Sequence, residues 1–316
     1  MFGKRVEWCV SEMDSFSLPS FAKINLWLEV KGRRPDGYHE LFTVFQTIDL
    51  RDQLYFEDAS GGGIELECDA DGIPTDGRNL VIKAAIALKE HFRVERGARI
   101  RLAKVIPTGG GLGGGSSNAA VTLLGLCRLW SIEPKHGELA KIARGLGADV
   151  PFFLIGGTAA GTGIGDHLTR IRDIHLAYLV VATPAVQVST AEAYRLLNSP
   201  ALTKDCTDII LSVSDAEAHV GDSLSSEPRN DFESVVFEIE PEVRRVKEKL
   251  RRLGAVVSLM SGSGSSVFGI FENREAQQFA FEGLKREADW RVFSCSTVSR
   301  EEYSEAIGSR AGLSSN

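Results

Sequence analysis

KVIPTGGGLGGGSSN (residues 104–118) holds six glycines around a single leucine. An apolar strand pattern (residues 99–106) leads into it, and residues 118–130 are apolar on nearly all sides, as in a buried helix. The side chains that could cap this helix are Ser116, Ser117 and Asn118. A helix N-terminus offers unpaired N–H groups and the positive end of the helix dipole, and glycines let phosphate oxygens approach them. The segment therefore predicts a strand, a polyphosphate-binding loop and a helix in succession.

Lys104 supports this interpretation. Its place in the strand pattern puts it on the same face as Ile100, Leu102 and Ile106, where a purely structural role would favour an apolar residue. A Walker loop would need a lysine directly before Ser116, and the sequence has glycine there, so that family is excluded.

A dinucleotide-binding loop is a weaker alternative. Gly109, Gly111 and Gly114 satisfy GxGxxG, but a glycine-rich run produces this match easily. The acidic residue that a dinucleotide fold places about 20 residues further on would fall near Glu133, between two predicted helices rather than at the end of a strand. A glycine loop with a purely structural role is the other alternative.

Composition limits the classes of partner. The 316-residue chain carries 36 basic and 43 acidic side chains, a net charge of −7, which argues against a nucleic-acid partner. No apolar run reaches the ~20 residues that span a bilayer, and the N-terminus lacks the apolar segment of a signal peptide, so we expect a cytoplasmic protein with no membrane partner. The five cysteines are far apart and include no CxxC pair, which favours reduced thiols over disulfides or a zinc site.

The rest of the chain predicts two α+β units. In the first, strands are expected at residues 22–30, 41–50, 64–67, 99–106 and 152–155, helices at 79–91, 118–130 and 139–146, and a second glycine-rich loop at 156–165. In the second, strands are expected at residues 178–182, 256–259, 267–271 and 291–295, helices at 241–253 and 275–287, and a polar loop with a short helix at 199–229. We assign residues 1–15 to a flexible extension with Met13 as an alternative start, 16–168 to an N-terminal domain and 169–316 to a C-terminal domain.

The glycine loop resembles the ATP loop of the GHMP kinase superfamily. The matching pattern, Pro-x-x-x-Gly-Leu-x-Ser-Ser, is carried here by Pro107, Gly111, Leu112, Ser116 and Ser117, with two extra glycines before the serines. That expanded loop resembles one branch, the 4-diphosphocytidyl-2-C-methyl-D-erythritol kinases of the non-mevalonate isoprenoid pathway. Further motifs agree in order, and the resemblance covers roughly residues 20 to 300: AKINL at 22–26, RPDGYH at 34–39, GADVP at 147–151 and MSGSG at 260–264.

The resemblance implies a fold and an activity. The fold would be a two-domain GHMP kinase, with an N-terminal domain like ribosomal protein S5, a C-terminal ferredoxin-like α/β sandwich and the active site between them. The activity would be ATP- and Mg²⁺-dependent phosphorylation of the 2-hydroxyl of 4-diphosphocytidyl-2-C-methyl-D-erythritol, by a monomer or weak homodimer. Two alternatives are a GHMP kinase for another small alcohol, such as homoserine, mevalonate or a sugar, and a nucleotide-binding regulator without catalysis. The DGYH segment argues against the first, and intact Lys23 and Asp149 argue against the second.

The resemblance also implies roles for individual residues in phosphoryl transfer. Asp149 would accept the proton of the substrate hydroxyl, and Lys23 would keep Asp149 ionised and steady the transferring phosphoryl group. Asn25 would contact the erythritol part of the substrate. The residues expected to bind ATP are Lys104, Pro107, Gly109, Gly110, Gly111, Leu112, Gly113, Gly114, Gly115, Ser116 and Ser117. Ser117 is a candidate magnesium ligand, and no carboxylate cluster marks a protein-held metal site.

Recognition of cytosine needs flat surfaces for stacking and polar groups for the base edge. By resemblance, Tyr38 and Tyr194 would stack on the base and His39 would read its edge, although phenylalanine is frequent at the position of Tyr194 in the family. The loop 157–165 would supply backbone donors to the diphosphate, with Ile164 lining the base pocket and Thr190 near the substrate. Residues 260–266 would brace the phosphate loop.

Overall fold

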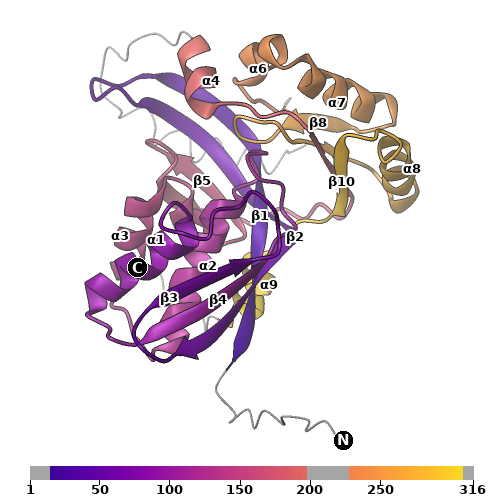
Figure 1. The fold of residues 1–316 in the computed structure, drawn as a ribbon. Coiled ribbons are helices and arrows are strands. Elements are labelled where there is room, and N and C mark those ends of the chain that lie inside the picture. Colours follow the sequence, from indigo (N-terminus) through magenta and orange to yellow (C-terminus); the bar gives the residue numbers. More distant parts are fainter. Residues whose placement is uncertain (1–14, 198–227, 309–316) are drawn as a thin grey trace, which may run out of the picture.

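The computed structural model describes residues 15–197 and 228–308. Within them the chain forms a six-stranded and a four-stranded sheet, which meet side by side (Figure 1). None of the described helices has the length and apolarity that crossing a bilayer requires. The predicted start at Met13, most of the flexible extension and most of the polar loop at 199–229 lie outside the described residues. Of the five cysteines, the three that are described are free thiols: Cys68, Cys127 and Cys295.

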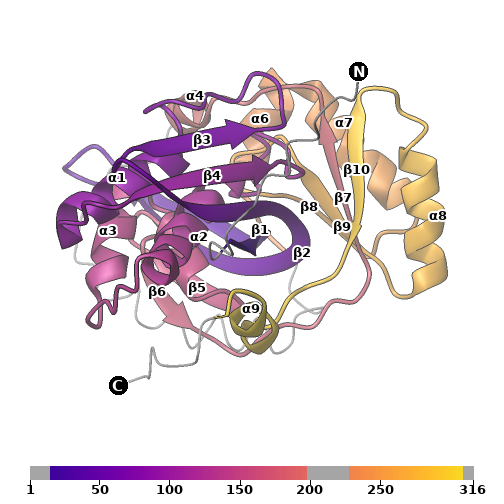
Figure 2. The same ribbon diagram turned by 60° about the horizontal axis from the view of Figure 1, so that its bottom comes forward.

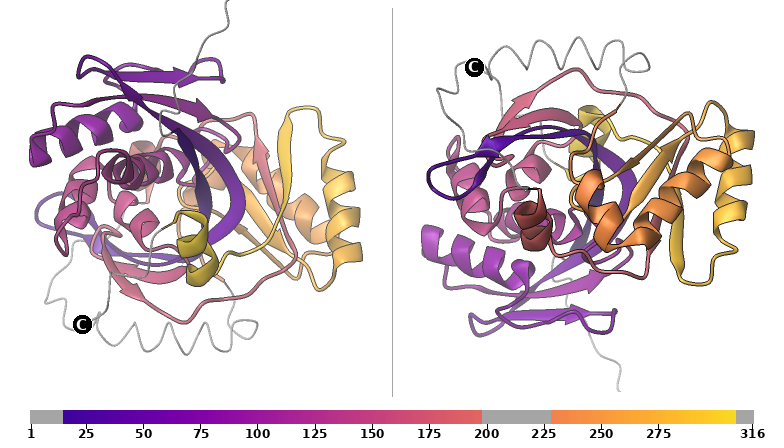
Figure 3. Two further views of the ribbon diagram at one scale, coloured as in Figure 1. Left: turned by 90° about the horizontal axis from the view of Figure 1, so that it is seen from below. Right: turned by 90° about the horizontal axis from the view of Figure 1, so that it is seen from above.

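A long antiparallel hairpin organises the first unit. Its strands are β1 (Phe16–Arg33) and β2 (His39–Ala59), and the apolar residues on their inner faces are almost fully buried. The sheet continues through β3 (Ile64–Cys68), β4 (Gly97–Ala103), β5 (Thr158–Thr162) and β6 (His167–Arg170). The sheet curves around α1 (Leu80–Phe92), α2 (Gly114–Leu129) and α3 (Glu138–Leu146), as Figures 2 and 3 show.

The second unit has the ferredoxin-like arrangement that was expected. Strands β7 (Leu179–Pro184), β8 (Val257–Met260), β9 (Val267–Ile270) and β10 (Trp290–Cys295) lie in the order β10-β7-β9-β8. Helices α7 (Pro241–Arg252) and α8 (Arg274–Leu284) cover the outer face of this sheet (Figure 1). The shorter helices α4 (Thr190–Leu196) and α6 (Glu233–Ile239) follow β7 in the chain.

The two units share an apolar cluster. Ile24 and Ile48 of the hairpin and Leu112 of the glycine loop are buried together with Leu259 and Phe268 of the second sheet. Removing these side chains from water stabilises the contact between the sheets by roughly 25 cal/mol per Å² of apolar area. The glycine loop is therefore held at the junction of the two units.

Three expectations for the first unit are wrong. Residues 150–154 form a 3₁₀ helix, η1 (Val150–Leu154), rather than a strand, because Pro151 lies in its first turn. Helix α2 begins at Gly114 with Gly113 as its N-cap and has no side-chain cap, so the serines lie inside the helix. Half of the second glycine-rich segment is strand β5, which pairs with β2 and β6.

The last described helix, α9 (Arg300–Ala306), returns to the first unit (Figure 2). Its Tyr303 is fully buried beside Phe21 and donates a hydrogen bond to the carbonyl oxygen of Phe153 at 2.5 Å. A domain boundary at residue 168 stays a prediction, and the contacts of α9 join the two predicted parts of the chain.

Candidate active site

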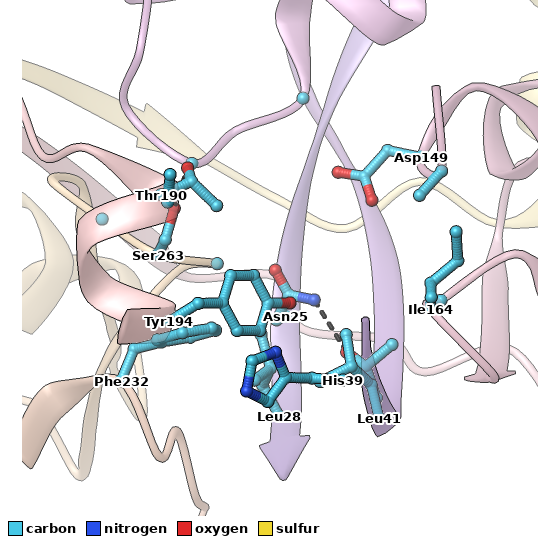
Figure 4. A pocket seen from close by; sticks show the side chains of 18 of the residues that line it. Asn25, Leu28, His39, Leu41, Asp149, Ile164, Thr190, Tyr194, Phe232 and Ser263 are labelled. Atoms are coloured by element: carbon cyan, nitrogen blue, oxygen red, sulfur yellow. Dashed lines mark hydrogen bonds between the residues drawn. The ribbon is translucent and has the colours of Figure 1, made fainter. Parts of the chain in front are cut away.

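A cleft of about 970 Å³ lies between the two units. Its walls come from the β1–β2 hairpin, the glycine loop, the start of η1, the β5–β6 turn, helix α4 and the turn at residues 262–264. Figure 4 shows Asn25 in the middle of this cleft, with Tyr194 and His39 to one side and Asp149 and Ile164 to the other. The cleft therefore brings together residues that were singled out in widely separated motifs.

Lys23 and Asp149 form an ion pair in the cleft. The Nζ of Lys23 lies 3.6 Å from Oδ2 of Asp149, and the lysine side chain is 4% exposed while the carboxylate is 35% exposed. Burial lowers the pKa of Lys23, and the charge of Asp149 acts in the opposite direction. Nζ also donates a hydrogen bond of 2.6 Å to Oδ1 of Asn25. A buried cation thus faces a carboxylate that solvent and a ligand can reach.

The glycine loop lies directly against this pair. The backbone N–H of Lys23 donates to the carbonyl of Leu112 at 3.0 Å, and a Cβ on Gly113 would come within 3.1 Å of the Lys23 side chain. Gly109, Gly111 and Gly113 line the cleft, each with a positive φ that disfavours other residues. Because α2 begins here without a side-chain cap, its first N–H groups are available to an anion.

Other members of the loop have supporting places. Pro107 is packed beside Gly110, whose own Cβ would meet Ser266, and Leu112 is buried in the shared apolar cluster. Gly114 would meet Ile106 and Lys104 if it carried a Cβ. Gly115 and Ser116, in the first turn of α2, are exposed and half-buried respectively.

Lys104 and Ser117 are both turned away from the cleft. Strand β4 ends at Ala103, and the Nζ of Lys104 donates to the fully buried carboxylate of Asp52 at 2.8 Å. Ser117 is 0% exposed and accepts a hydrogen bond of 2.8 Å from the hydroxyl of Ser20. Neither residue is among those that line the cleft, and their contacts with ATP and magnesium stay predictions.

The turn between β8 and β9 braces the glycine loop. Ser261 Oγ donates to the carbonyl of Gly111 at 3.0 Å, and the N–H of Ser266 donates to the carbonyl of Gly110 at 3.1 Å. A Cβ on Gly111 would lie 2.1 Å from the carbonyl oxygen of Ser261, so only glycine permits this approach. The bracing role expected for this turn is confirmed.

An aromatic group forms the other end of the cleft. The rings of His39 and Tyr194 stack with centroids 4.8 Å apart, and Phe232 meets Tyr194 edge-on at 4.8 Å. Burial lowers the pKa of His39, and the charge of Arg33 lowers it further. Tyr38 lines the cleft next to His39 and is 61% exposed. The structure thus brings His39 and Tyr194 together and leaves Tyr38 at the opening.

The β5–β6 turn contributes Ile164 and Gly165 to the cleft. Its backbone donors are already used: the N–H groups of Gly163, Ile164 and Gly165 donate to Glu40, Asp166 and Thr162. These three N–H groups are therefore already partnered, and the contact of residues 157–165 with a diphosphate stays a prediction. Ile164 remains an apolar wall.

Sequence reasoning gave no site role to several residues of the cleft, among them Arg33, Thr43, Phe45 and Phe232. Ser263 shares a hydrogen bond of 2.7 Å with Thr190, which ties α4 to the β8–β9 turn. Thr43 could have been found from the alternation of β2, since it points to the same side as Phe45. No pattern in the sequence marks Phe232.

Family models match two parts of the chain: GHMP kinases N terminal domain over residues 79–157, and GHMP kinases C terminal over residues 216–289. A protein of Acetivibrio thermocellus named 4-diphosphocytidyl-2-C-methyl-D-erythritol kinase is 39% identical over 286 residues, which is 90% of this chain and 100% of the relative. One of Chlorobium phaeobacteroides with the same name is 43% identical over 85% of this chain and 93% of its own length. The chain belongs to the 4-diphosphocytidyl-2-C-methyl-D-erythritol kinase family. It is a small-molecule kinase of the GHMP type.

Solved structures agree with membership of the 4-diphosphocytidyl-2-C-methyl-D-erythritol kinase family. A crystal structure of 4-(cytidine 5'-diphospho)-2C-methyl-D-erythritol kinase superposes with a TM-score of 0.73 at 36% identity, covering 89% of this chain and 99% of that one. Homoserine kinase from Cytophaga hutchinsonii gives 0.68 at 21% identity, covering 92% and 97%, and this likeness concerns the fold alone. The two-domain GHMP fold expected from the motifs is confirmed.

Proposed function

We propose that the chain transfers the γ-phosphoryl group of ATP to the 2-hydroxyl of 4-diphosphocytidyl-2-C-methyl-D-erythritol. The observation that carries this proposal is the position of the Lys23–Asp149 pair, which lies between the glycine loop and the aromatic group of His39 and Tyr194. A phosphoryl donor on the loop and a cytidine on the aromatic side would meet at this pair.

Asp149 would act as the proton acceptor. Its carboxylate is the only one among the described residues that line the cleft, and its partial exposure lets a hydroxyl approach it. The ammonium of Lys23 would keep Asp149 ionised and offset the charge that develops on the transferring phosphoryl group. Burial lowers the pKa of Lys23, and the neighbouring carboxylate of Asp149 opposes this shift and so favours the charged lysine.

ATP fits the glycine loop, whose uncapped helix start and glycine backbone suit polyphosphate. No group of three or more acidic, histidine or cysteine side chains among the described residues could cage a metal ion. Magnesium would therefore be held chiefly by the ATP phosphates, with Asp149 as the carboxylate of the cleft, and it would screen the phosphate charge. A cytoplasmic location and a monomeric or weakly dimeric state stay predictions.

The test is ATP turnover by the purified protein with one acceptor at a time. We expect turnover with 4-diphosphocytidyl-2-C-methyl-D-erythritol and little with homoserine, mevalonate or methylerythritol phosphate, because contacts to the cytidine help to position the reacting hydroxyl. Equal turnover with and without the cytidine group would overturn the substrate assignment and leave only a GHMP kinase for another alcohol. Nucleotide binding without turnover of any acceptor would favour a regulator.

A further inference from the structure

Thr43 of β2 lies beside Asn25 and is almost fully buried. Its hydroxyl makes two hydrogen bonds of 2.7 Å: it donates to the carbonyl oxygen of Trp27 and accepts from Nδ2 of Asn25. Figure 4 draws the second of these as the dashed line from Asn25. Asn25 accepts in turn from the ammonium of Lys23. A continuous chain of hydrogen bonds therefore runs from a backbone carbonyl to the charged end of Lys23.

The direction of this chain is fixed by its two ends. A carbonyl oxygen can only accept, so the single proton of the Thr43 hydroxyl goes to Trp27 and leaves a lone pair for Asn25. The amide must then present its NH₂ group to Thr43 and its oxygen to Lys23. An ammonium can only donate, so the amide oxygen is the end of Asn25 that Lys23 requires.

A β-bulge makes this arrangement possible. The register of the hairpin shifts between Asn25, which pairs with Phe45, and Trp27, which pairs with Val44. The extra residue re-aims the following backbone, a role that bulges have near active sites. It brings the carbonyl of Trp27 within hydrogen-bond distance of Thr43.

We propose that Thr43 is a positioning residue for phosphoryl transfer, which acts through Asn25 on Lys23. This inference rests on the proposed function, because it gives Lys23 a role in the reaction. Without the Thr43 hydroxyl, the buried NH₂ group of Asn25 has no acceptor at that end, and the amide must turn to find one. Lys23 then loses the oxygen that holds its ammonium beside Asp149.

The positioning role of Thr43 is tested by Thr43→Val, which keeps the shape of the side chain and removes its hydroxyl. We expect kcat to fall about 10- to 100-fold with KM for ATP nearly unchanged, and Thr43→Ser to restore most of the activity. Thr47→Val is the matched control, since Thr47 lies on the same strand, is fully buried and has a hydroxyl with no hydrogen-bond partner. If valine at 43 prevents folding, Thr43→Ala serves the same comparison. Wild-type kcat in a folded Thr43 variant without the hydroxyl would overturn the inference.

A double-mutant cycle separates this role from general support of the strand. If Thr43 acts through Asn25, Thr43→Val costs no further kcat in an Asn25→Ala background. The full loss in both backgrounds would show that Thr43 acts by another route and would overturn the proposal.

A pH profile gives a second readout. Loss of the Asn25 oxygen as acceptor favours the neutral amine of Lys23, so the alkaline limb of the kcat–pH profile should move to lower pH in Thr43→Val and not in Thr47→Val. A wild-type protein without kinase activity would instead refute the proposed function.

Discussion

The imidazole of His39 stacks on the phenol ring of Tyr194, with ring centroids 4.8 Å apart and planes 22° from parallel. The two residues come from different units, since His39 begins β2 and Tyr194 lies on α4. The aromatic end of the cleft therefore exists only when both units are in place. A flat surface of this kind suits a pyrimidine, which stacks on aromatic faces.

Tyr38→Ala should weaken binding of the cytidine substrate by roughly 1 to 3 kcal/mol, the range for one stack of a base on an aromatic ring. Affinity for ATP should stay the same, because the glycine loop lies elsewhere in the cleft. Tyr38 is mostly exposed, so the melting temperature should hardly change. Calorimetric titration with each ligand measures both effects. Tyr194→Phe is the matched control at the other stacking residue, since it keeps the aromatic ring. A loss of substrate affinity in Tyr194→Phe equal to that in Tyr38→Ala would contradict a stacking role for Tyr194.

Substrate affinity should depend on the protonation of His39. Because burial lowers the pKa of His39 from its ordinary value of 6.5, the imidazole is neutral at pH 7 and takes up a proton only at more acid pH. If the neutral ring is the form that binds, KM for the cytidine substrate should be constant from pH 8 to 6.5 and rise below. His39→Gln should flatten this dependence. A KM in the wild type that is constant down to pH 5 would count against a role for His39.

Asp149→Asn should lower kcat by about 10² to 10⁴ while ATP still binds. The amide keeps the shape of the carboxylate and cannot accept the substrate proton. Loss of the negative charge also removes what raises the pKa of Lys23, so the lysine should become easier to deprotonate. Steady-state kinetics measures the effect on kcat, and nucleotide titration measures ATP binding separately. Near-normal kcat in the folded variant would remove Asp149 from the mechanism.

The phosphate site is tested best at Gly115. Gly113→Val should abolish nucleotide binding, but a Cβ there would lie 2.8 Å from the Phe153 ring, so loss of packing would contribute. A Cβ on Gly115 meets only Leu80, at an ordinary 3.6 Å, and Gly115 lies in the exposed first turn of α2. Gly115→Ala should keep the melting temperature and raise KM for ATP at least about tenfold, as a methyl group displaces phosphate from the helix start.

The matched control for Gly115→Ala is Gly145→Ala. Gly145 lies inside α3, where a Cβ has open space around it. Alanine favours a helix over glycine by up to about 1 kcal/mol, so neither variant should be less stable than the wild type. If Gly115→Ala and Gly145→Ala bind ATP equally well, the phosphates do not lie at the start of α2.

Lys104→Met should lower the free energy of unfolding and leave ATP binding unchanged. The substitution leaves the carboxylate of Asp52 buried without its cation, a change that costs about 3 to 5 kcal/mol in buried ion pairs. Chemical denaturation should show this loss, whereas the same change at the exposed Lys135 should not. A raised KM for ATP at unchanged stability would return Lys104 to the nucleotide site, as the sequence pattern predicts.

Much of the fold follows from local patterns. The helix at residues 241–252 is marked by Pro241 in its first turn and a stripe of buried valine and leucine, and the structure confirms it. The strands around residues 256–271 are confirmed in the same way. These segments have clear periodicity because each buries one face against one neighbour.

The wrong assignments share a physical cause. Residues 152–155 are apolar because several elements surround them, and such a run does not distinguish a strand from a buried helical turn. The glycines from 156 to 165 indicate close approach as well as loops: a Cβ on Gly161 would meet Phe45 at 2.9 Å inside the sheet. Contacts distant in sequence decide both cases.

The sequence predicts which residues form the candidate site better than it predicts their burial, for a similar reason. Lys23, Asn25 and Asp149 were found through motifs, and the structure brings them to one place. Their burial could not be predicted, because an alternating strand pattern puts Lys23 and Asn25 on the polar face. The glycine loop and the β8–β9 turn lie against that face, since a Cβ on Gly113 or Gly262 would come within 3.1 or 3.3 Å of the Lys23 side chain, so the strand is buried on both sides.

Helix α9 bears on the order in which the chain becomes stable during synthesis. The ring of Tyr303 occupies the space that a Cβ on Gly156 would need, at 2.3 Å, and it covers Phe21 from strand β1. Both of these partners leave the ribosome long before the tyrosine does. The N-terminal half of a nascent chain therefore carries an uncovered apolar surface until α9 is made, so the core of the first unit is complete only after Arg300–Ala306 of this kinase have been synthesised.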